Sequence, residues 1–415
     1  MENKLIITKH DKKIISAFFE GKDMVQVSLN ASEESGILGN IYLGKVKNII
    51  KNINAAFIEI AEGRMCYFSL EENRYPIMAN TQNDDDRKLT DVKVKIGDEL
   101  LVQVTKEDVK TKAPVVSSNL SFTGKYAALT YGKATNGVSS KITDEKERNR
   151  LRSISKKFGH TEFGFIIRTN AAYMPEEKII SEMQTLIDTY ENIRKFGVHK
   201  SRFSLLFKTP PNYICDIRDG YADNVDEFVT DDPELYDNIK NFLEAYQPED
   251  MEKLRFYQDA TLSLAGLYGI NDKLLGAVRP MVWLKSGGSL VIQPTEALTV
   301  IDVNTGKAVA GKKKVQETFL KVNREAAKEI AKQIRLRNLS GIIIIDFIDM
   351  ELKKDKELLM EELEEYIKKD PIKTTLVDMT ALGLVEVTRK KVRKPLHEQV
   401  EELNFGINKD GFDGK

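Results

Sequence analysis

Apolar and polar residues alternate in three segments within residues 1–35. The segments, 4–8, 13–19 and 24–29, are separated by charged residues and a glycine. A period of two is typical of strands that bury one face, so we predict an antiparallel hairpin or meander. So short a piece cannot bury a core alone, and we expect it to pair with a strand from later in the chain.

Residues 36–122 carry short apolar segments with turn residues between them. This spacing predicts a small closed barrel of short strands. A polar, acid-rich stretch at 80–88 interrupts the pattern and is expected to be a surface loop. The expected strands lie at 40–50, 54–60, 64–70 and 99–106.

A helical period joins the strand pattern in the next two regions. Residues 123–208 combine a strand at 162–167, which runs into a polar turn, with a helix at 175–196. Residues 209–278 alternate short strands with helices, and Asp232 begins one of these helices as an N-cap would.

Two apolar strands in residues 279–396 flank a long amphipathic segment. Its apolar residues between 315 and 334 step by three or four, which predicts a helix whose apolar stripe packs into a core. The tail, 397–415, is polar and contains glycines, and we expect it to fray.

Composition narrows the class of protein. With 415 residues and 41% apolar residues, the chain can bury two to four compact cores. Lys and Arg number 63 against 64 Asp and Glu, so the net charge is −1. This balance argues against a protein that coats nucleic acid indiscriminately, although a local basic groove stays open.

The two cysteines, Cys66 and Cys215, lie far apart and in no paired motif. A disulfide framework and a thiolate zinc site are therefore not expected, and each cysteine is interpreted as a small buried residue. The first ten residues lack the apolar core of a signal peptide, and no apolar run is long enough to span a membrane. We expect the reducing environment of the cytoplasm.

Two of the apolar strands end in an aspartate. The segment 297–302 ends at Asp302, and Asn304 follows on the same face of the strand. The segment 341–346 ends at Asp346. If these strands are parallel and joined by the long helix, both carboxylates emerge at the same edge of the sheet. Two such groups could hold Mg²⁺, with Asn304 orienting one of them.

A plainer interpretation stays open, because a strand-end aspartate often caps a loop or pairs with a lysine. Asp349 is a third acid nearby, but it follows Ile348 and can simply cap the next segment. The glycine at 306 and the lysines at 307 and 312–314 would suit a loop that a phosphate approaches.

Three segments closely resemble the ribonuclease E/G family of endoribonucleases: Thr295–Asn304, Asn323–Arg337 and Gly341–Met350. The likeness extends from Asn40 to Leu396. It implies magnesium-dependent cleavage of single-stranded RNA that leaves 5′-phosphate and 3′-hydroxyl ends. By this resemblance Asp302 and Asp346 stand at metal-ligand positions, and Asn304 stands where one ligand is oriented.

The resemblance also implies an α/β fold of several subdomains. A ribonuclease-H-like subdomain would contain an inserted S1 barrel of the OB-fold type and a 5′-sensor region, and a deoxyribonuclease-I-like catalytic subdomain would follow. The implied bounds are 1–35 and 209–278 for the ribonuclease-H-like parts, 36–122 for the barrel, 123–208 for the sensor region, 279–396 for the catalytic subdomain and 397–415 for the tail.

Phe57 and Tyr67 lie on neighbouring strands of the expected barrel. The residues alone leave two interpretations open, because exposed aromatic rings stack on unpaired bases whereas inward-facing rings fill the barrel. The resemblance favours base stacking. Lys112 matches a lysine that contacts RNA near the cleaved bond, although a lone lysine is usually solvated.

Arg168 and Thr169 follow an apolar strand, and a guanidinium beside a hydroxyl suits a terminal phosphate. On the residues alone, an ordinary ion pair of Arg168 is the favoured interpretation. The resemblance implies that the pair reads a 5′-monophosphate. Where the family often has a second arginine, this chain has Ser140 and Lys141, which implies a weaker preference because lysine offers only a point charge.

A basic run at 388–394 contains Arg389 and Lys391. Such runs are usually solvated, but five cations beside the expected catalytic strands could contact the RNA backbone. The resemblance favours that interpretation.

Two other hypotheses stay open: a non-catalytic RNA-binding protein that uses the S1-like barrel, and a structural-metal protein without a role in RNA. The zinc-binding cysteine motif with which family members commonly form oligomers is not found after Leu396. We therefore do not expect zinc-linked dimers, while another kind of homo-oligomer stays open.

Overall fold

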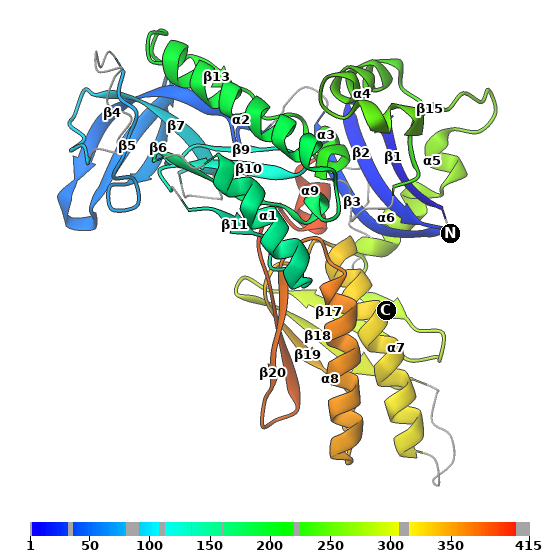
Figure 1. Cartoon of the computed structure of the whole chain (residues 1–415). Coiled ribbons are helices and arrows are strands. Elements are labelled where there is room, and N and C mark those ends of the chain that lie inside the picture. Colours follow the sequence, from blue (N-terminus) through cyan, green and yellow to red (C-terminus); the bar gives the residue numbers. More distant parts are fainter. Residues whose placement is uncertain are drawn as a thin grey trace. The chain divides into compact units, whose positions relative to one another are not determined.

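The computed structural model describes residues 2–31, 36–79, 91–107, 113–133, 135–158, 161–219, 225–306 and 315–403 (Figure 1). The chain divides into two compact units. The first unit combines residues 1–34, 212–217 and 224–415, and the second combines residues 35–211 and 218–223. In the part of the chain that the structure describes, no helix has both the length and the apolar character needed to cross a membrane.

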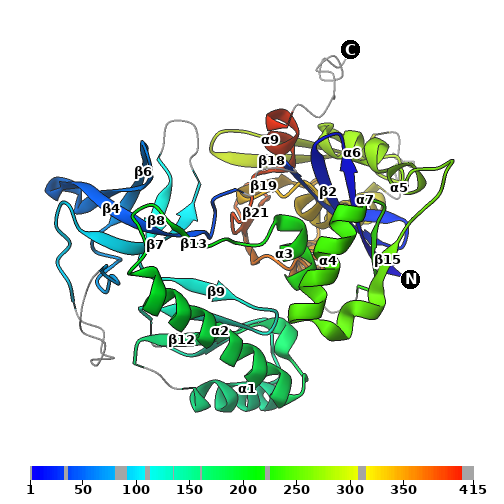
Figure 2. The ribbon, with the colours of Figure 1, turned by 90° about the horizontal axis from the view of Figure 1, so that it is seen from above.

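One sheet of the first unit has the strand order β15–β14–β1–β2–β3. Figure 2 labels two of its strands, β2 and β15. β1, β2 and β3 form an antiparallel meander, and β14 pairs with β1 in parallel. The predicted meander and its later partner are therefore confirmed. The strands are β1 (Asn3–His10), β2 (Lys13–Glu20), β3 (Asp23–Ala31), β14 (Glu227–Thr230) and β15 (Leu254–Phe256). The helices of this part are α3 (Asn212–Asp219), whose last two residues belong to the second unit, α4 (Pro233–Tyr246), α5 (Leu264–Leu267) and α6 (Ile270–Val278).

The second sheet of the first unit has the order β16–β17–β18–β19–β21–β20. β18 and β19 are parallel, and α7 (Val315–Leu336) connects them as predicted. The strands are β16 (Met281–Trp283), β17 (Ser289–Pro294), β18 (Leu298–Asn304), β19 (Gly341–Asp346), β20 (Thr374–Met379) and β21 (Leu384–Arg389).

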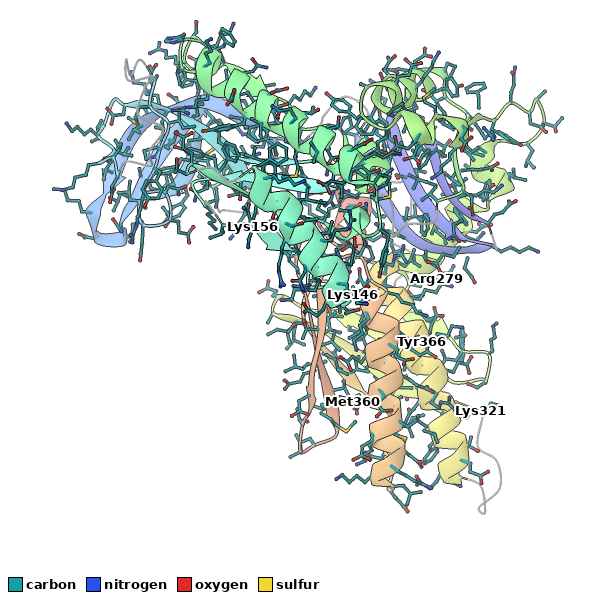
Figure 3. The ribbon with its side chains drawn as sticks, viewed as in Figure 1. Lys146, Lys156, Arg279, Lys321, Met360 and Tyr366 are labelled. Carbon is teal, nitrogen blue, oxygen red and sulfur yellow. The ribbon has the colours of Figure 1, made fainter. Side chains whose placement is uncertain are left out.

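The apolar stripe of α7 forms part of the core beneath this sheet. Val322, Ala326 and Ile330 are buried against strand residues that include Ile301 and Ile345. The helix α8 (Lys353–Lys368) runs beside α7 (Figure 1). Met360 and Tyr366 of α8 pack against the same core, while Lys321 of α7 is exposed (Figure 3). The predicted role of the stripe is confirmed.

The second unit contains a closed five-stranded barrel, consistent with an OB-type fold. The order is β4–β5–β6–β8–β7, and β7 pairs back with β4 to close the ring. Residues such as Ile58, Cys66 and Phe68 fill the interior. The predicted barrel is confirmed. Its strands are β4 (Ile41–Ile50), β5 (Ala55–Ala61), β6 (Arg64–Ser69), β7 (Glu99–Lys106) and β8 (Val115–Ser117), and β13 (Leu205–Phe207) adds to β4.

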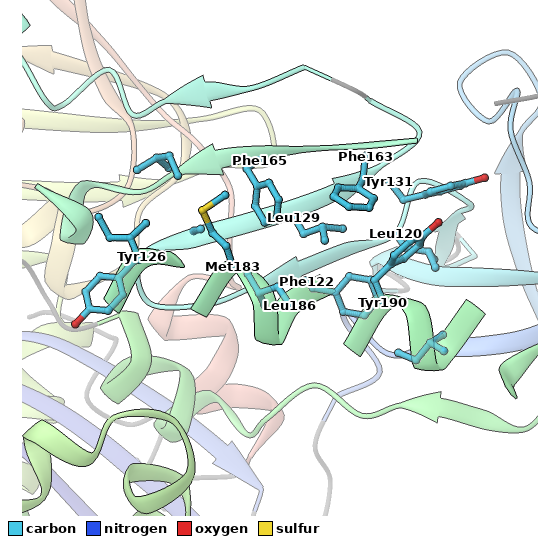
Figure 4. Close-up of a cluster of buried hydrophobic side chains, with 14 of the residues drawn as sticks. Leu120, Phe122, Tyr126, Leu129, Tyr131, Phe163, Phe165, Met183, Leu186 and Tyr190 are labelled. Carbon is cyan, nitrogen blue, oxygen red and sulfur yellow. The ribbon is translucent and has the colours of Figure 1, made fainter. Parts of the chain in front are cut away.

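A four-stranded sheet of order β11–β12–β10–β9 completes the second unit. Buried aromatic side chains, among them Phe122, Phe165 and Tyr190, pack between this sheet and α2 (Figure 4). The same core includes Ile41 and Leu101 of the barrel, so no core boundary follows residue 122. The elements are β9 (Ser121–Thr123), β10 (Ala127–Tyr131), β11 (Gly137–Val138), α1 (Glu145–Lys157), β12 (Phe163–Ile167) and α2 (Glu176–Gly197).

The beginning of the expected frayed tail is ordered, and that prediction is wrong as far as residue 403. Residues Leu396–Glu402 form the helix α9. Leu396 and Val400, one turn apart, are buried in the core of the first sheet. Gln399 Oε1 accepts a hydrogen bond from Leu29 N at 2.9 Å. The apolar i, i+4 pair and this bond hold the segment on β3.

Arg389, which was expected to contact RNA, is buried in the first unit and only 3% exposed. Its Nε lies 2.6 Å from Asp370 Oδ2, and its Nη1 donates to Asn338 Oδ1 at 2.7 Å and to the Leu339 carbonyl at 3.0 Å. These contacts use the guanidinium to join β21 to two loops. The expectation of an RNA contact is wrong for Arg389, because its donors are already used inside the fold, whereas Lys391 is exposed.

The substitution Arg389→Ala is expected to lower the free energy of unfolding by about 3–5 kcal/mol, because it leaves the carboxylate of Asp370 buried without its cation. Urea denaturation followed by circular dichroism measures this loss. Lys391→Ala is the matched control and should change stability by no more than about 0.5 kcal/mol. An Arg389→Ala protein as stable as the parent would contradict the structural role.

Candidate functional site

Asp302 and Asp346 stand directly opposite each other at the ends of the parallel strands β18 and β19. Their neighbours Ile301 and Ile345 are buried in the core, so period-two alternation directs both aspartates to the other face of the sheet. Asp302 is half-buried and Asp346 is exposed. The structure therefore brings the two carboxylates together at one edge, as the strand pattern predicted.

Asn304 is tied to the first of these acids. Its Nδ2 donates a hydrogen bond to Asp302 Oδ2 at 2.7 Å. An amide that binds one oxygen of a carboxylate restricts its rotation and directs the other oxygen. The predicted contact between Asn304 and Asp302 is present.

Electrostatics at the pair favour a cation. Partial burial raises the pKa of Asp346, and the negative charges of Asp302 and Asp349 raise it further. A divalent cation would relieve this repulsion, and carboxylate oxygens are the ligands that Mg²⁺ prefers. Within the described ranges, no group of three or more acidic, histidine or cysteine residues is placed to hold a metal. The donor set thus fits an ion that binds through two carboxylates and keeps several waters.

Asn323 is a supporting residue to which the sequence analysis assigned no role. It is fully buried on α7, its Nδ2 donates to the Ile348 carbonyl at 2.7 Å, and its Oδ1 accepts from Ile348 N at 3.1 Å. This two-way bond fixes the backbone between Asp346 and Asp349. A polar residue inside an apolar helical stripe was the available signal, because a buried amide needs a partner.

The loop after β18 begins at Gly306, where φ is +53°. A Cβ at this position would lie 2.2 Å from the carbonyl oxygen of Gly287, so only glycine fits. The lysines at 307 and 312–314, expected to approach phosphate, lie outside the described residues.

Phe57 and Tyr67 form a cross-strand pair on β5 and β6. Their ring centroids are 6.3 Å apart and the planes meet at 84°. The adjacent residues Ile58, Cys66 and Phe68 fill the barrel, so the two rings lie on its outer face and do not fill its interior. Lys112, the third predicted RNA contact of this region, lies outside the described residues.

Arg168, Thr169 and Lys141 come together because β11 pairs in parallel with β12. Arg168 and Thr169 follow β12, and Thr169 starts a short 3₁₀ turn. The hydroxyls of Thr169 and Ser139 lie 3.0 Å apart, and Lys141 N donates to Ser139 Oγ at 3.3 Å. The Lys141 side chain is exposed. The structure therefore brings Thr169, next to Arg168, to the turn that contains Lys141.

Arg168 also makes the ion pair that the plainer interpretation expected. Its Nη1 lies 2.8 Å from Asp219 Oδ1. Burial acts to raise the pKa of Asp219, but the guanidinium groups of Arg168 and Arg218 outweigh it and hold that pKa below its usual value. The sequence analysis missed Arg218 and Asp219, because no local pattern signals a contact between residues 51 positions apart.

Comparisons with known proteins agree with this geometry. A sequence model of the ribonuclease E/G family matches residues 121–392. Ribonuclease E of Synechocystis sp. is 34% identical over 400 residues, which cover 95% of this chain and 58% of that protein. Ribonuclease G of Salmonella typhimurium is 31% identical over 401 residues, which cover 95% of this chain and 81% of that protein. The chain belongs to the ribonuclease E/G family.

Proposed function

We propose that this protein is a magnesium-dependent endoribonuclease that cleaves single-stranded RNA in RNA processing and decay, and leaves 5′-phosphate and 3′-hydroxyl ends. The observation that carries the proposal is the in-register pair Asp302 and Asp346 on adjacent parallel strands. The names of the relatives, ribonuclease E and ribonuclease G, support the same activity.

In this proposal Asp302 and Asp346 hold Mg²⁺, and the remaining ligands are water and a phosphate oxygen of the RNA. Bound there, the ion would polarise the phosphodiester and lower the pKa of a water. The protein contributes orientation. Asn304 fixes the carboxylate of Asp302, and Asn323 fixes the backbone that follows Asp346.

The finer fold assignment belongs to the same proposal. The order β15–β14–β1–β2–β3, with three antiparallel strands followed by parallel ones, supports a ribonuclease-H-like subdomain built from 1–35 and 209–278. The mixed sheet beneath α7 and α8 supports a deoxyribonuclease-I-like catalytic subdomain at 279–396. The barrel of 36–122 would serve as the S1 RNA-binding part, and 123–208 as the 5′-sensor region.

Asp302→Asn and Asp346→Asn are each expected to abolish cleavage of a 5′-labelled single-stranded RNA in magnesium, because each removes a charged metal ligand. Asn304→Ala, which removes only the orienting contact, should lower the rate by about 10–100-fold. Asp378→Asn, at an exposed position of the same sheet, is the control. RNA binding in a gel-shift assay should persist in all four variants.

Full activity of either aspartate variant would rule out this centre. A second candidate function is that of a non-catalytic S1-type RNA-binding protein. The observation that favours it is the aromatic pair on the outer face of the barrel. This candidate predicts a gel shift with no cleavage under any divalent cation, so the same labelled RNA, incubated with magnesium and with a chelator, separates the two.

Phe57 and Tyr67 are proposed to stack on unpaired bases. Replacing either ring with alanine should weaken binding of single-stranded RNA by about 1–3 kcal/mol, which is roughly 5–150-fold in Kd. Fluorescence anisotropy measures this change. Phe196→Ala removes an exposed ring on α2 and is the matched control. If Phe57→Ala and Tyr67→Ala bind RNA as the control does, the outer face of β5 and β6 is not a base-stacking surface.

Arg168, Thr169 and Lys141 are proposed to bind a 5′-monophosphate, so RNA with this end should be cut faster than RNA with a 5′-hydroxyl. Arg168→Ala should remove the difference. Lys141→Arg should increase it, because a guanidinium can bind phosphate with two hydrogen bonds where an ammonium offers a point charge. Initial rates on two RNAs that differ only at the 5′ end decide this, and equal rates for the parent protein would contradict end sensing.

A further inference from the structure

Among the described residues, the hydrogen bonds of the Arg168 side chain all come from one nitrogen. Its Nη1 donates both to Asp219 Oδ1, at 2.8 Å, and to the carbonyl of Gly124. Nη1 carries two of the five guanidinium hydrogens, so these two acceptors use it fully. Within the described ranges, Nε and Nη2 of Arg168 make no hydrogen bond. These two donors form one edge of the guanidinium, and such an edge binds a phosphate with two parallel bonds.

The carbonyl of Gly124 is itself held in place. Glu182 of α2 accepts hydrogen bonds from the backbone N–H groups of Lys125, Tyr126 and Ala127 at 2.7–2.9 Å. A Cβ on Gly124 would lie 2.4 Å from Glu182 Oε1, so a larger residue at this position would displace the Glu182 carboxylate from these N–H groups. Glu182 therefore fixes the turn that presents one of the two acceptors to Arg168.

Asp219, the other acceptor, is fixed by Arg218 and Asn170. Arg218 binds its carboxylate with Nε to Oδ1 at 2.9 Å and with Nη2 to Oδ2 at 3.2 Å. Asn170, next to Thr169, donates from Nδ2 to the Asp219 carbonyl at 2.9 Å. Two guanidinium groups thus face the Asp219 carboxylate, and the remaining nitrogen of Arg218, Nη1, donates to the Thr123 carbonyl at 3.2 Å.

We propose that Asp219 and Arg218 are part of the 5′-end site: Asp219 positions Arg168 so that its Nε and Nη2 edge meets the terminal phosphate, and Arg218 holds the Asp219 carboxylate in place. This inference rests on the proposed end sensing. Asp219 is a positioning residue and does not touch the phosphate.

The test compares KM and kcat of the 415-residue chain for two RNAs of one sequence, with a 5′-monophosphate or a 5′-hydroxyl. Asp219→Ala and Arg218→Ala should each raise KM for the 5′-monophosphate RNA roughly tenfold, as expected if Arg168 loses one charge-assisted contact to the phosphate when it is no longer held in position. The kcat and the KM for the 5′-hydroxyl RNA should not change. Asp219→Asn keeps an acceptor oxygen and should recover part of the effect.

Two further variants distinguish a positioning role of Asp219 from a general loss of structure: a double variant and a control at a matched ion pair. Arg168→Ala combined with Asp219→Ala should lose no more than Arg168→Ala alone, because both changes remove one function. Arg194→Ala breaks an ion pair with Glu162 of the same 2.8 Å length and similar exposure, 27% against 26% for Arg168. This control should leave both KM values unchanged. If Asp219→Ala does not fold, Asp219→Asn and Arg218→Ala still decide the question.

Two results would overturn the proposal. One is an unchanged KM in the Asp219 and Arg218 variants while Arg168→Ala loses end preference. The other is a stronger preference in Asp219→Ala or Asp219→Asn, which would mean that the carboxylate competes with the phosphate. If Arg168→Ala does not change the preference for 5′-monophosphate RNA, the proposed end sensing and this inference are both wrong. The proposal that cleavage depends on Asp302 and Asp346 would not be affected by that result.

Discussion

The parallel, in-register pairing of β18 with β19 is the constraint on which the rest of the site depends. Parallel neighbours need a crossover, and α7 supplies it while its apolar stripe covers the sheet. Because Ile301 and Ile345 are buried on one face, Asp302 and Asp346 must share the other. A slip of one residue in either strand would turn an aspartate into the core, so the packing that stabilises the sheet also brings the acids together.

The two candidate centres have opposite electrostatic designs. The acid pair favours a cation: partial burial raises the pKa of Asp346, and the charges of Asp302 and Asp349 raise it further. At the other centre the described residues bind Arg168 through Nη1, which leaves its Nε and Nη2 edge for an anion. In each centre a polar side chain that is not an expected ligand fixes the nearby backbone through hydrogen bonds. This residue is Asn323 in the first unit and Glu182 in the second.

Strand periodicity predicted the aspartate pair and the barrel because those features are local. It also contained the signal against Arg389, which we did not use: Val385, Val387 and Arg389 alternate on one buried face of β21, so the arginine had to point inward. The contact between Arg168 and Asp219 is different. This contact joins residues that are 51 positions apart in the sequence. Neither the composition nor the spacing of residues indicates it.

The most direct measurement is anomalous X-ray diffraction from crystals soaked in Mn²⁺, which takes the same oxygen ligands as Mg²⁺. The account predicts one strong peak about 2 Å from a carboxylate oxygen of Asp302 and from one of Asp346. Absence of a peak between these two side chains, in crystals where Mn²⁺ binds elsewhere, would contradict the central claim that they share one divalent ion.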